Sequence, residues 1–205
     1  MPKLDQTEWE AANESSAGEF KVMEPGIYPC IITGVQTEWD TQQGHVTSDE
    51  RQCVRILLDV AEGEFAGEFS DGFYEDKPYA HAVYMSWKPS AYGMQAGHCI
   101  LALEEANPGF DPEAAFTADQ WMLFIGKKCL VSFNGSEYTS NRGDVRVRVR
   151  PDRIITSDDE PKITVELENG TKVDWEDYAS VNGDAAPSKS TAAPAAAYDD
   201  SDVPF

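Results

Sequence analysis

The sequence predicts a mainly β fold: a five-stranded barrel with a helical insertion, followed by a disordered C-terminal tail. Short runs of β-branched and aromatic residues, separated by turn residues, recur along residues 21–155. A helix-compatible stretch interrupts these runs. From about residue 179 the composition shifts to Ala, Pro and Ser, which offers too few large apolar side chains to form a core.

The first strands are expected to form a meander. Residues 26–35 are entered through the turn pair Pro25-Gly26, and residues 53–60 follow after a polar loop at 41–50. A Gly-rich turn then leads to a third strand near Phe69. Three strands in this order favour antiparallel neighbours.

The next segment is expected to be largely helical. Residues 79–87 could form a strand, and residues 90–106 suit a helix that ends at Asn107-Pro108-Gly109. A second short helix is expected at 117–126, capped by Thr117. The candidates for the buried stripe of the first helix are Met94, Ile100, Leu101 and Leu103.

Two strands close the predicted barrel. They cover residues 129–133 and 144–150, with a polar loop between them that includes Asn134-Gly135 and Asn141-Arg142-Gly143. Three strands, a helical insertion and two more strands is the order expected of an oligonucleotide-binding (OB) barrel.

These signals divide the chain into five parts. They are an N-terminal arm or short helix (1–20), the OB-like domain (21–155), an appended hairpin or extension around Asn169-Gly170 (156–178), a disordered linker (179–198) and an acidic tip (199–205).

Composition limits the class of protein. The four cysteines, Cys30, Cys53, Cys99 and Cys129, are widely spaced, so we expect reduced core thiols rather than a zinc site or a disulfide framework. No apolar signal region and no run of about 18 apolar residues occurs, which predicts a soluble, cytoplasmic protein without a membrane partner, in the host cytoplasm if it is phage-encoded.

The formal net charge of −21 argues against nucleic-acid binding, because neutralising phosphates requires Lys and Arg. Residues 156–205 carry −9 and residues 1–155 still carry −12. Five of the sixteen basic residues nevertheless fall between Arg142 and Arg153. At a Debye length of about 8–10 Å, such a local concentration counts more than the total charge.

The basic concentration has the pattern of an arginine ladder. In residues 145–150, Val and Arg alternate strictly, so a strand would place Arg146, Arg148 and Arg150 on one face. A spacing of about 6.6–6.8 Å along the strand suits the phosphates of an extended single strand. Arg142 and Arg153 flank the ladder, and Arg55 lies on the second strand. The alternative is a half-buried strand whose outer face is solvated or paired with acids.

Aromatic side chains could provide stacking platforms for bases. The candidates are Trp39 beside the polar loop, Tyr138 just before the arginine ladder, and the group Tyr84, Trp87 and Lys88 near the insertion. Each aromatic ring could equally be part of the core. The aromatic residues expected in the core are Phe65, Phe69, Phe73, Phe116, Trp121, Phe124 and Phe133.

The sequence gives no support for catalysis. It contains no P-loop, no H-E-x-x-H and no G-x-S-x-G motif. His45, His81 and His98 are not spaced for metal binding with one another or with the cysteines. We therefore expect no enzyme activity, no metal and no cofactor.

The C-terminal tip is the most specific motif. Three aspartates precede an aliphatic residue, Pro and a terminal Phe, an order suited to a partner pocket that has a basic rim. The residues are Asp199, Asp200, Asp202, Val203, Pro204 and Phe205. This tip resembles the acidic tail of bacterial-type single-stranded DNA-binding proteins, which docks on replication and repair proteins.

Together with the strand order, the tip makes the whole chain similar to single-stranded DNA-binding proteins of tailed phages. This resemblance implies a protein that coats single-stranded DNA during replication, recombination or repair and recruits replication or recombination proteins through the tip. A homo-oligomer is compatible with it, although the insertion at 79–106 argues against a bacterial-type tetramer. The alternative is an acidic DNA mimic or interaction module that occupies the groove of a nuclease or polymerase.

Overall fold

The computed structural model describes residues 22–41, 44–70, 74 and 77–182. The expected N-terminal arm (1–20), most of the linker, the tip (199–205) and Phe73 lie outside these residues. The elements are β1 (Gly26–Gln36), β2 (Glu38–Thr41), β3 (Gly44–Thr47), α2 (Ser48–Arg51), β4 (Cys53–Val60), η2 (Pro78–His81), β5 (Ala82–Ser86), α3 (Ala96–Ala106), α4 (Pro112–Thr117), η3 (Trp121–Phe124), β6 (Lys128–Thr139), β7 (Val145–Ile155), β8 (Thr164–Glu166), β9 (Lys172–Asp174) and α5 (Trp175–Asn182).

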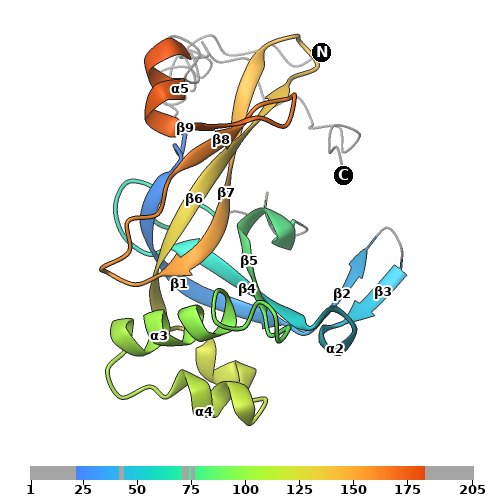
Figure 1. The fold of residues 1–205 in the computed structure, drawn as a ribbon, viewed down its shortest axis with the longest axis vertical. Coiled ribbons are helices and arrows are strands. Elements are labelled where there is room, and N and C mark those ends of the chain that lie inside the picture. Colours follow the sequence, from blue (N-terminus) through green and yellow to red (C-terminus); the bar gives the residue numbers. More distant parts are fainter. Residues whose placement is uncertain (1–21, 42–43, 71–73, 75–76, 183–205) are drawn as a thin grey trace, which may run out of the picture.

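The fold is mainly β, as the sequence predicts, and is built on one large mixed sheet (Figure 1). The strand order is β5-β4-β1-β6, and β7 pairs with the opposite edge of β6. The described strands have no ladder between β5 and β7, so the sheet is not a closed barrel. Strands β2 and β3 form a separate two-stranded sheet.

Strand β6 organises the sheet because it is long enough to serve several partners. Its first half pairs antiparallel with β1, from Lys128 to Phe133. Beyond that point the same edge pairs in parallel with β8, at Gly135 and Ser136. The β6–β7 hairpin therefore extends past the end of β1, and the β8–β9 hairpin and α5 lie against this extension (Figure 1).

The core lies on one face of this sheet. On β4 the alternate residues Val54, Ile56 and Leu58 are fully buried, as the period of two in their sequence predicts. Phe133 on β6 belongs to the same cluster. Leu103 of α3 and residues of α4 and η3 complete it, and Figure 1 places these helices together at one end of the sheet.

Two predicted strands match the structure closely, and the third is wrong. Strand β4 has the expected bounds and β1 is one residue longer than expected. Phe69 lies in a turn, because the Asp59 carboxylate accepts hydrogen bonds from the Phe69 N–H at 3.0 Å and from the Ser70 hydroxyl. The third strand of the meander is β5 instead.

The polar loop expected at 41–50 is partly structured. Strand β3 and most of helix α2 lie within this range, and β2 ends at its first residue. Asn134-Gly135 likewise falls inside β6 rather than in a loop. The pairing of β6 with β7 explains this difference, because it satisfies the backbone groups of Asn134 and Gly135 and confines the turn to residues 140–144.

The helices begin and end at other residues than expected. α3 starts at Ala96, and of its expected buried stripe Met94 and Leu101 are exposed, whereas Ile100 and Leu103 are buried. α4 ends at Thr117 instead of starting there. Its N-cap is Asp111, whose carboxylate accepts from the Ala114 N–H at 2.8 Å.

The expected core is largely confirmed. Phe69, Phe124 and Phe133 are buried, while Phe65, Phe116 and Trp121 are partly buried and pack against the core. The cysteines are free thiols. Cys30, Cys99 and Cys129 are buried and Cys53 is partly exposed. Burial raises the pKa of Cys30 and Cys99 to about 12, which keeps these thiols protonated at neutral pH.

The residues after β7 form the β8–β9 hairpin around Asn169-Gly170, where Gly170 has a φ of 80°. Helix α5 continues to Asn182. Within the described part of the chain, no helix has the length and apolar character needed to cross a membrane.

Gly135 is a position where the sheet has no room for a side chain. A Cβ there would lie 2.7 Å from Val147 Cγ1 and 3.0 Å from Val165 Cγ2. We expect Gly135→Val to lower the free energy of unfolding by about 1–3 kcal/mol through overpacking, measured by urea denaturation. Ser136→Ala, at the next position, is the control. An unchanged midpoint for Gly135→Val would contradict this account of the β6–β7–β8 junction.

Candidate nucleic-acid interface

The arginine ladder lies on β7, on the face of the sheet opposite the core. Arg146, Arg148 and Arg150 stand opposite Tyr138, Ser136 and Asn134 of β6, and cross-strand partners share a face. The three arginines are partly exposed. The alternation in the sequence thus yields one row of guanidinium groups, as expected.

A β-bulge adds a fourth arginine to this row. The register shifts so that Phe133 stands opposite Pro151 and Ser132 opposite Arg153, which leaves Asp152 without a partner. Simple alternation would have put Arg153 on the other face. Because Ser132 shares a face with Asn134, the bulge turns Arg153 toward the side that carries Arg150.

The four arginines differ in their neighbours. Arg146 and Arg153 each have a carboxylate at 3.8 Å, from Asp144 and Asp152, in exposed contacts that are weak in water. Among the residues that the structure describes, Arg148 and Arg150 have no carboxylate partner. Arg148 Cζ instead lies 4.8 Å from the ring centroid of Tyr138.

A second cationic group lies on the adjoining strands. The Arg55 guanidinium is 4.7 Å from the ring centroid of Trp39 and 5.5 Å from that of Tyr84, and its Nε donates to the Tyr84 hydroxyl at 3.0 Å. Arg55 and Trp39 are buried, whereas Tyr84 is 43 % exposed. Of the predicted platforms here, Tyr84 is open to solvent and Trp39 is covered.

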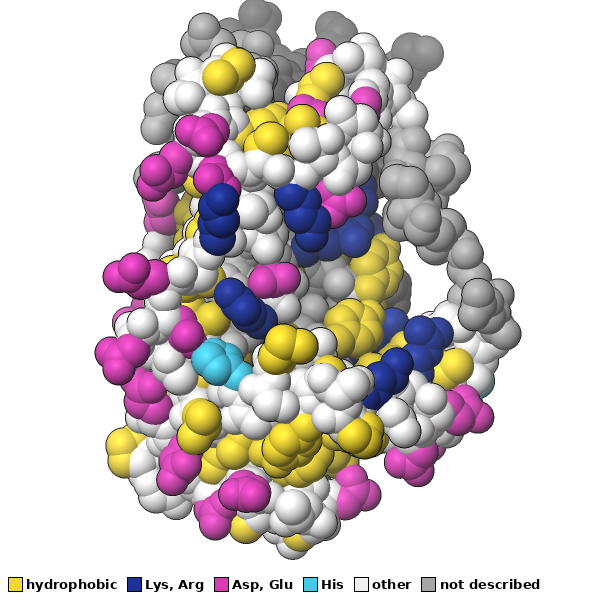
Figure 2. Space-filling model, in the orientation of Figure 1, with side chains coloured by type: hydrophobic (Ala, Val, Ile, Leu, Met, Phe, Trp, Pro, Cys, Tyr) yellow, Lys and Arg dark blue, Asp and Glu magenta, His cyan; other side chains and the backbone are white. Residues whose placement is uncertain are grey.

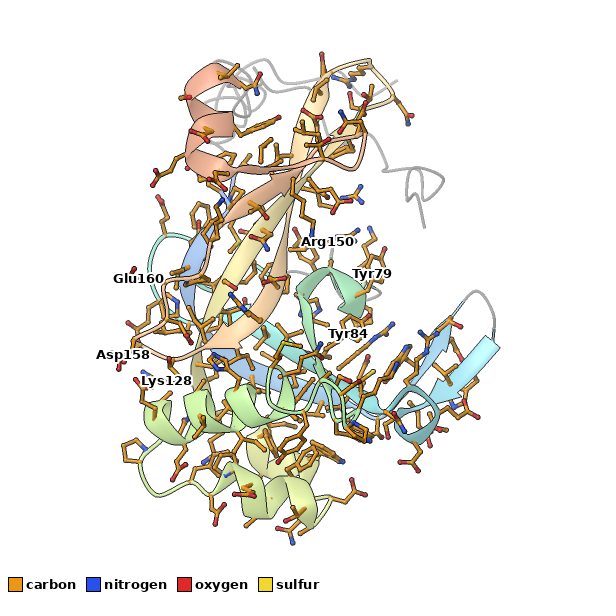
Figure 3. All side chains as sticks on the ribbon, viewed as in Figure 1. Tyr79, Tyr84, Lys128, Arg150, Asp158 and Glu160 are labelled. Atoms are coloured by element: carbon orange, nitrogen blue, oxygen red, sulfur yellow. The ribbon has the colours of Figure 1, made fainter. Side chains whose placement is uncertain are left out.

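The two cationic groups meet where β7 contacts η2 and β5. Figure 3 shows Arg150 on β7 near Tyr79 of η2 and Tyr84 of β5. Figure 2 shows Lys and Arg side chains on two sides of an apolar area on this face. We call the surface formed by Arg146, Arg148, Arg150, Arg153, Tyr138, Tyr79, Tyr84 and Arg55 the arginine–tyrosine face.

Burial lowers the pKa of Arg150, and the neighbouring charge of Arg148 lowers it further, while Tyr79 and Tyr84 oppose the shift. The group still stays protonated at neutral pH, because an Arg pKa starts far above it. Tyr79 was not among the sequence candidates. Only the long-range contact of η2 with β7 brings it to this face, and no local pattern signals that contact.

The remaining candidates lie elsewhere. Trp87 belongs to an aromatic cluster with Trp121, at 6.3 Å between ring centroids, and with Phe116, at 6.1 Å. Lys88 follows it and is exposed. Arg142 is exposed in the turn at the end of the β6–β7 hairpin. The structure therefore does not bring Trp87 together with the arginine ladder.

A polar pocket of about 240 Å³ adjoins the arginine–tyrosine face. Asn134, Ser136 and Arg150 line it on one side, and Glu166 and Lys172 on the other. Asp152 also lines it, and together with Glu166 it brings negative charge into the pocket, which does not favour a phosphate. No group of three or more His, Cys, Asp or Glu side chains in the described ranges is arranged to hold a metal ion.

Neither a protein-family model nor a curated protein sequence matches this chain.

We expect Arg55→Ala to loosen the contact of Trp39 with the sheet, because the guanidinium packs on the Trp39 ring and on the Tyr84 ring, which also meet edge-on at 6.2 Å between centroids. The expected result is a red shift of tryptophan emission and faster proteolytic cleavage in the β2–β3 hairpin. Lys88→Ala is the control, at an exposed cation whose charge, like that of Arg55, opposes the rise that burial causes in the pKa of Cys53. An unchanged emission maximum and cleavage rate for Arg55→Ala would show that the hairpin is held by other contacts.

Proposed function

We propose that this protein binds single-stranded DNA on the arginine–tyrosine face. The observation that carries the proposal is the convergence of Arg148 and Arg150, which lack carboxylate partners among the described residues, with the exposed ring of Tyr84. Sequence-independent binding of single strands combines cationic side chains that follow the backbone with aromatic rings that stack on bases. This face offers both.

The topology supports an OB-type arrangement. The order β5-β4-β1-β6-β7 is that of a five-stranded OB barrel opened at one seam, and β5 contacts β7 at that seam. The helical insertion falls between β5 and β6. OB folds bind oligonucleotides on strands 2 and 3 and on the loops after strands 1 and 4. The equivalent regions here are β4–β5, the β2–β3 hairpin and the turn between β6 and β7.

Physically, the bound strand would run along β7. Its phosphates would replace solvent and ions around the guanidinium groups, and the release of counterions would drive association. Bases would stack on Tyr84 and, beside Arg148, on Tyr138, with each stacked base contributing about 1–3 kcal/mol. Backbone contacts and stacking read no base edges, so binding should show little sequence preference.

The net charge of −21 would keep nonspecific contacts with DNA weak elsewhere on the surface. In this proposal the protein coats and protects single strands in the cytoplasm during phage replication, recombination or repair. The tip residues Asp199 to Phe205 recruit replication or recombination proteins. An acidic DNA mimic would explain the total charge but not the clustered arginines.

The arginine ladder should set the salt dependence of binding. We expect Arg146→Ala, Arg148→Ala and Arg150→Ala together to weaken binding to oligo-dT and to reduce the slope of log K against log salt by about 2, at roughly 0.7 per phosphate contact for single strands. Fluorescence anisotropy at several salt concentrations measures this. Lys162→Ala, Lys127→Ala and Lys128→Ala remove the same charge away from this face and serve as the control.

If the triple arginine variant keeps the full slope, the groove lies on another surface. If the unaltered protein fails to bind oligo-dT even at low salt, the DNA-mimic alternative is favoured instead.

The tip should have two separable effects. As a polyanion, it would compete with phosphate for the arginine–tyrosine face when DNA is absent. We expect removal of residues 199–205 to tighten binding to oligo-dT and to abolish binding to partner enzymes, measured by anisotropy and by pull-down of purified replication proteins. Phe205→Ala, which keeps the three aspartates, should lose the partners without tightening DNA binding. Unchanged DNA affinity after truncation would refute the competition.

A further inference from the structure

Arg150 is held differently from the other arginines of the ladder. Its Nε is buried and has no hydrogen-bond partner among the described residues. None of its guanidinium nitrogens makes a hydrogen bond or ion pair within the described ranges. A buried donor without a partner is costly, and this cost disappears when an acceptor arrives. Arg146 and Arg153, by contrast, each have a carboxylate nearby.

The surroundings of Arg150 suit one class of ligand. Tyr79, Tyr84 and Arg148 are close enough to shift the pKa of Arg150, and no carboxylate is among the groups that shift it. Figure 3 shows Arg150 and the two tyrosines converging from β7, η2 and β5. Tyr84 contacts Arg55 but keeps 43 % of its surface exposed. A guanidinium without a counterion can bind a phosphate, and an exposed ring beside it can stack on a base. This combination suits a nucleotide, in which a phosphate is joined to a base.

We propose that Arg150 and Tyr84 form a subsite for one nucleotide, in which the Arg150 guanidinium binds the phosphate and the Tyr84 ring stacks on the base. This inference rests on the proposed function and deepens it. Arg146, Arg148 and Arg153 attract the strand through charge, whereas Arg150 fixes its position. Arg150 also lines the polar pocket, but the phosphate is placed on the Tyr84 side of the guanidinium, because Asp152 and Glu166 would repel it on the pocket side.

The subsite requires Arg rather than any cation. A guanidinium presents its donors in a planar fork that binds phosphate in a bidentate manner, whereas a Lys ammonium is a compact point charge. In the side-on form of this fork, Nε–H and one terminal nitrogen donate to two oxygens of the same phosphate, which would give the unpaired Arg150 Nε an acceptor. Arg150→Lys therefore keeps the charge and removes the geometry, which separates this role from electrostatic attraction.

The test compares Arg150→Lys with the matched variant Arg146→Lys, by anisotropy with labelled oligo-dT over a range of salt. We expect Arg150→Lys to bind roughly 10-fold more weakly at every salt concentration with an unchanged slope, because a lost charged hydrogen bond is worth about that factor. Arg146→Lys should stay within about 2-fold of the unaltered protein, since its exposed contact is weak. Thermal unfolding checks that both variants are folded.

Tyr84→Leu tests the other half of the subsite and does not depend on the folding of the Arg150 variant. It should weaken binding roughly 10-fold with the same slope. Tyr92→Leu, at a tyrosine with similar exposure (39 %), should have no effect. In the double variant, the losses from Arg150→Lys and Tyr84→Leu should not multiply, because both act on one nucleotide.

Three results would overturn the subsite. Normal binding by Arg150→Lys, equal losses for Arg150→Lys and Arg146→Lys, or fully multiplicative losses in the double variant would each do so and leave the proposed function standing. Failure of the unaltered protein to bind oligo-dT would remove the proposed function, and the subsite with it.

Discussion

The register of β7 on β6 is the constraint on which the candidate site depends. Because Arg146 stands opposite Tyr138 and Arg150 opposite Asn134, the valines between them face the core side and the arginines face outward. A slip of one residue would exchange the two sets. Gly135 limits such slippage, since Val147 and Val165 close around it where three strands meet. Packing on the core side of the sheet thus determines which side chains, the arginines, lie on the opposite face.

Local arrangement, rather than composition, gives this chain its cationic surface. The chain has 37 acidic and 16 basic residues, so most exposed cations would be expected to have an acid close by. Arg148 and Arg150 have no acidic neighbour on the two strands, because their flanking residues in β7 are Val and Pro and their cross-strand neighbours are Ser136 and Asn134. Arg55 is likewise held by rings rather than by carboxylates.

Sequence periodicity predicts strand bounds and side-chain faces where one face of the strand is buried. It fails where contacts between distant segments determine the position of a side chain or turn. It predicts the bounds of β4 to the residue and those of β1 to within one residue, and it places Arg146, Arg148 and Arg150 on one face.

The sequence does not predict that Asn134-Gly135 lies in a strand, because this pair is typical of turns and only its pairing with β7 makes it part of β6. Trp39 is covered by Arg55, and Trp87 stacks on Trp121, since aromatic packing depends on contacts between distant segments. Tyr79 gave no signal for the same reason.

The bulge at Asp152 makes chain length matter as much as residue type. On its N-terminal side the even-numbered residues face outward, and on its C-terminal side Arg153 does, while Ile154 and Ile155 are both buried. If the bulge were straightened without loss of a residue, Asp152 would stand opposite Ser132, and Arg153 would stand opposite Val131 on the core side, in the place of Ile154. Loss of Asp152 itself would keep both sets of pairs, whereas loss of a paired residue on either side would shift one set to the opposite face.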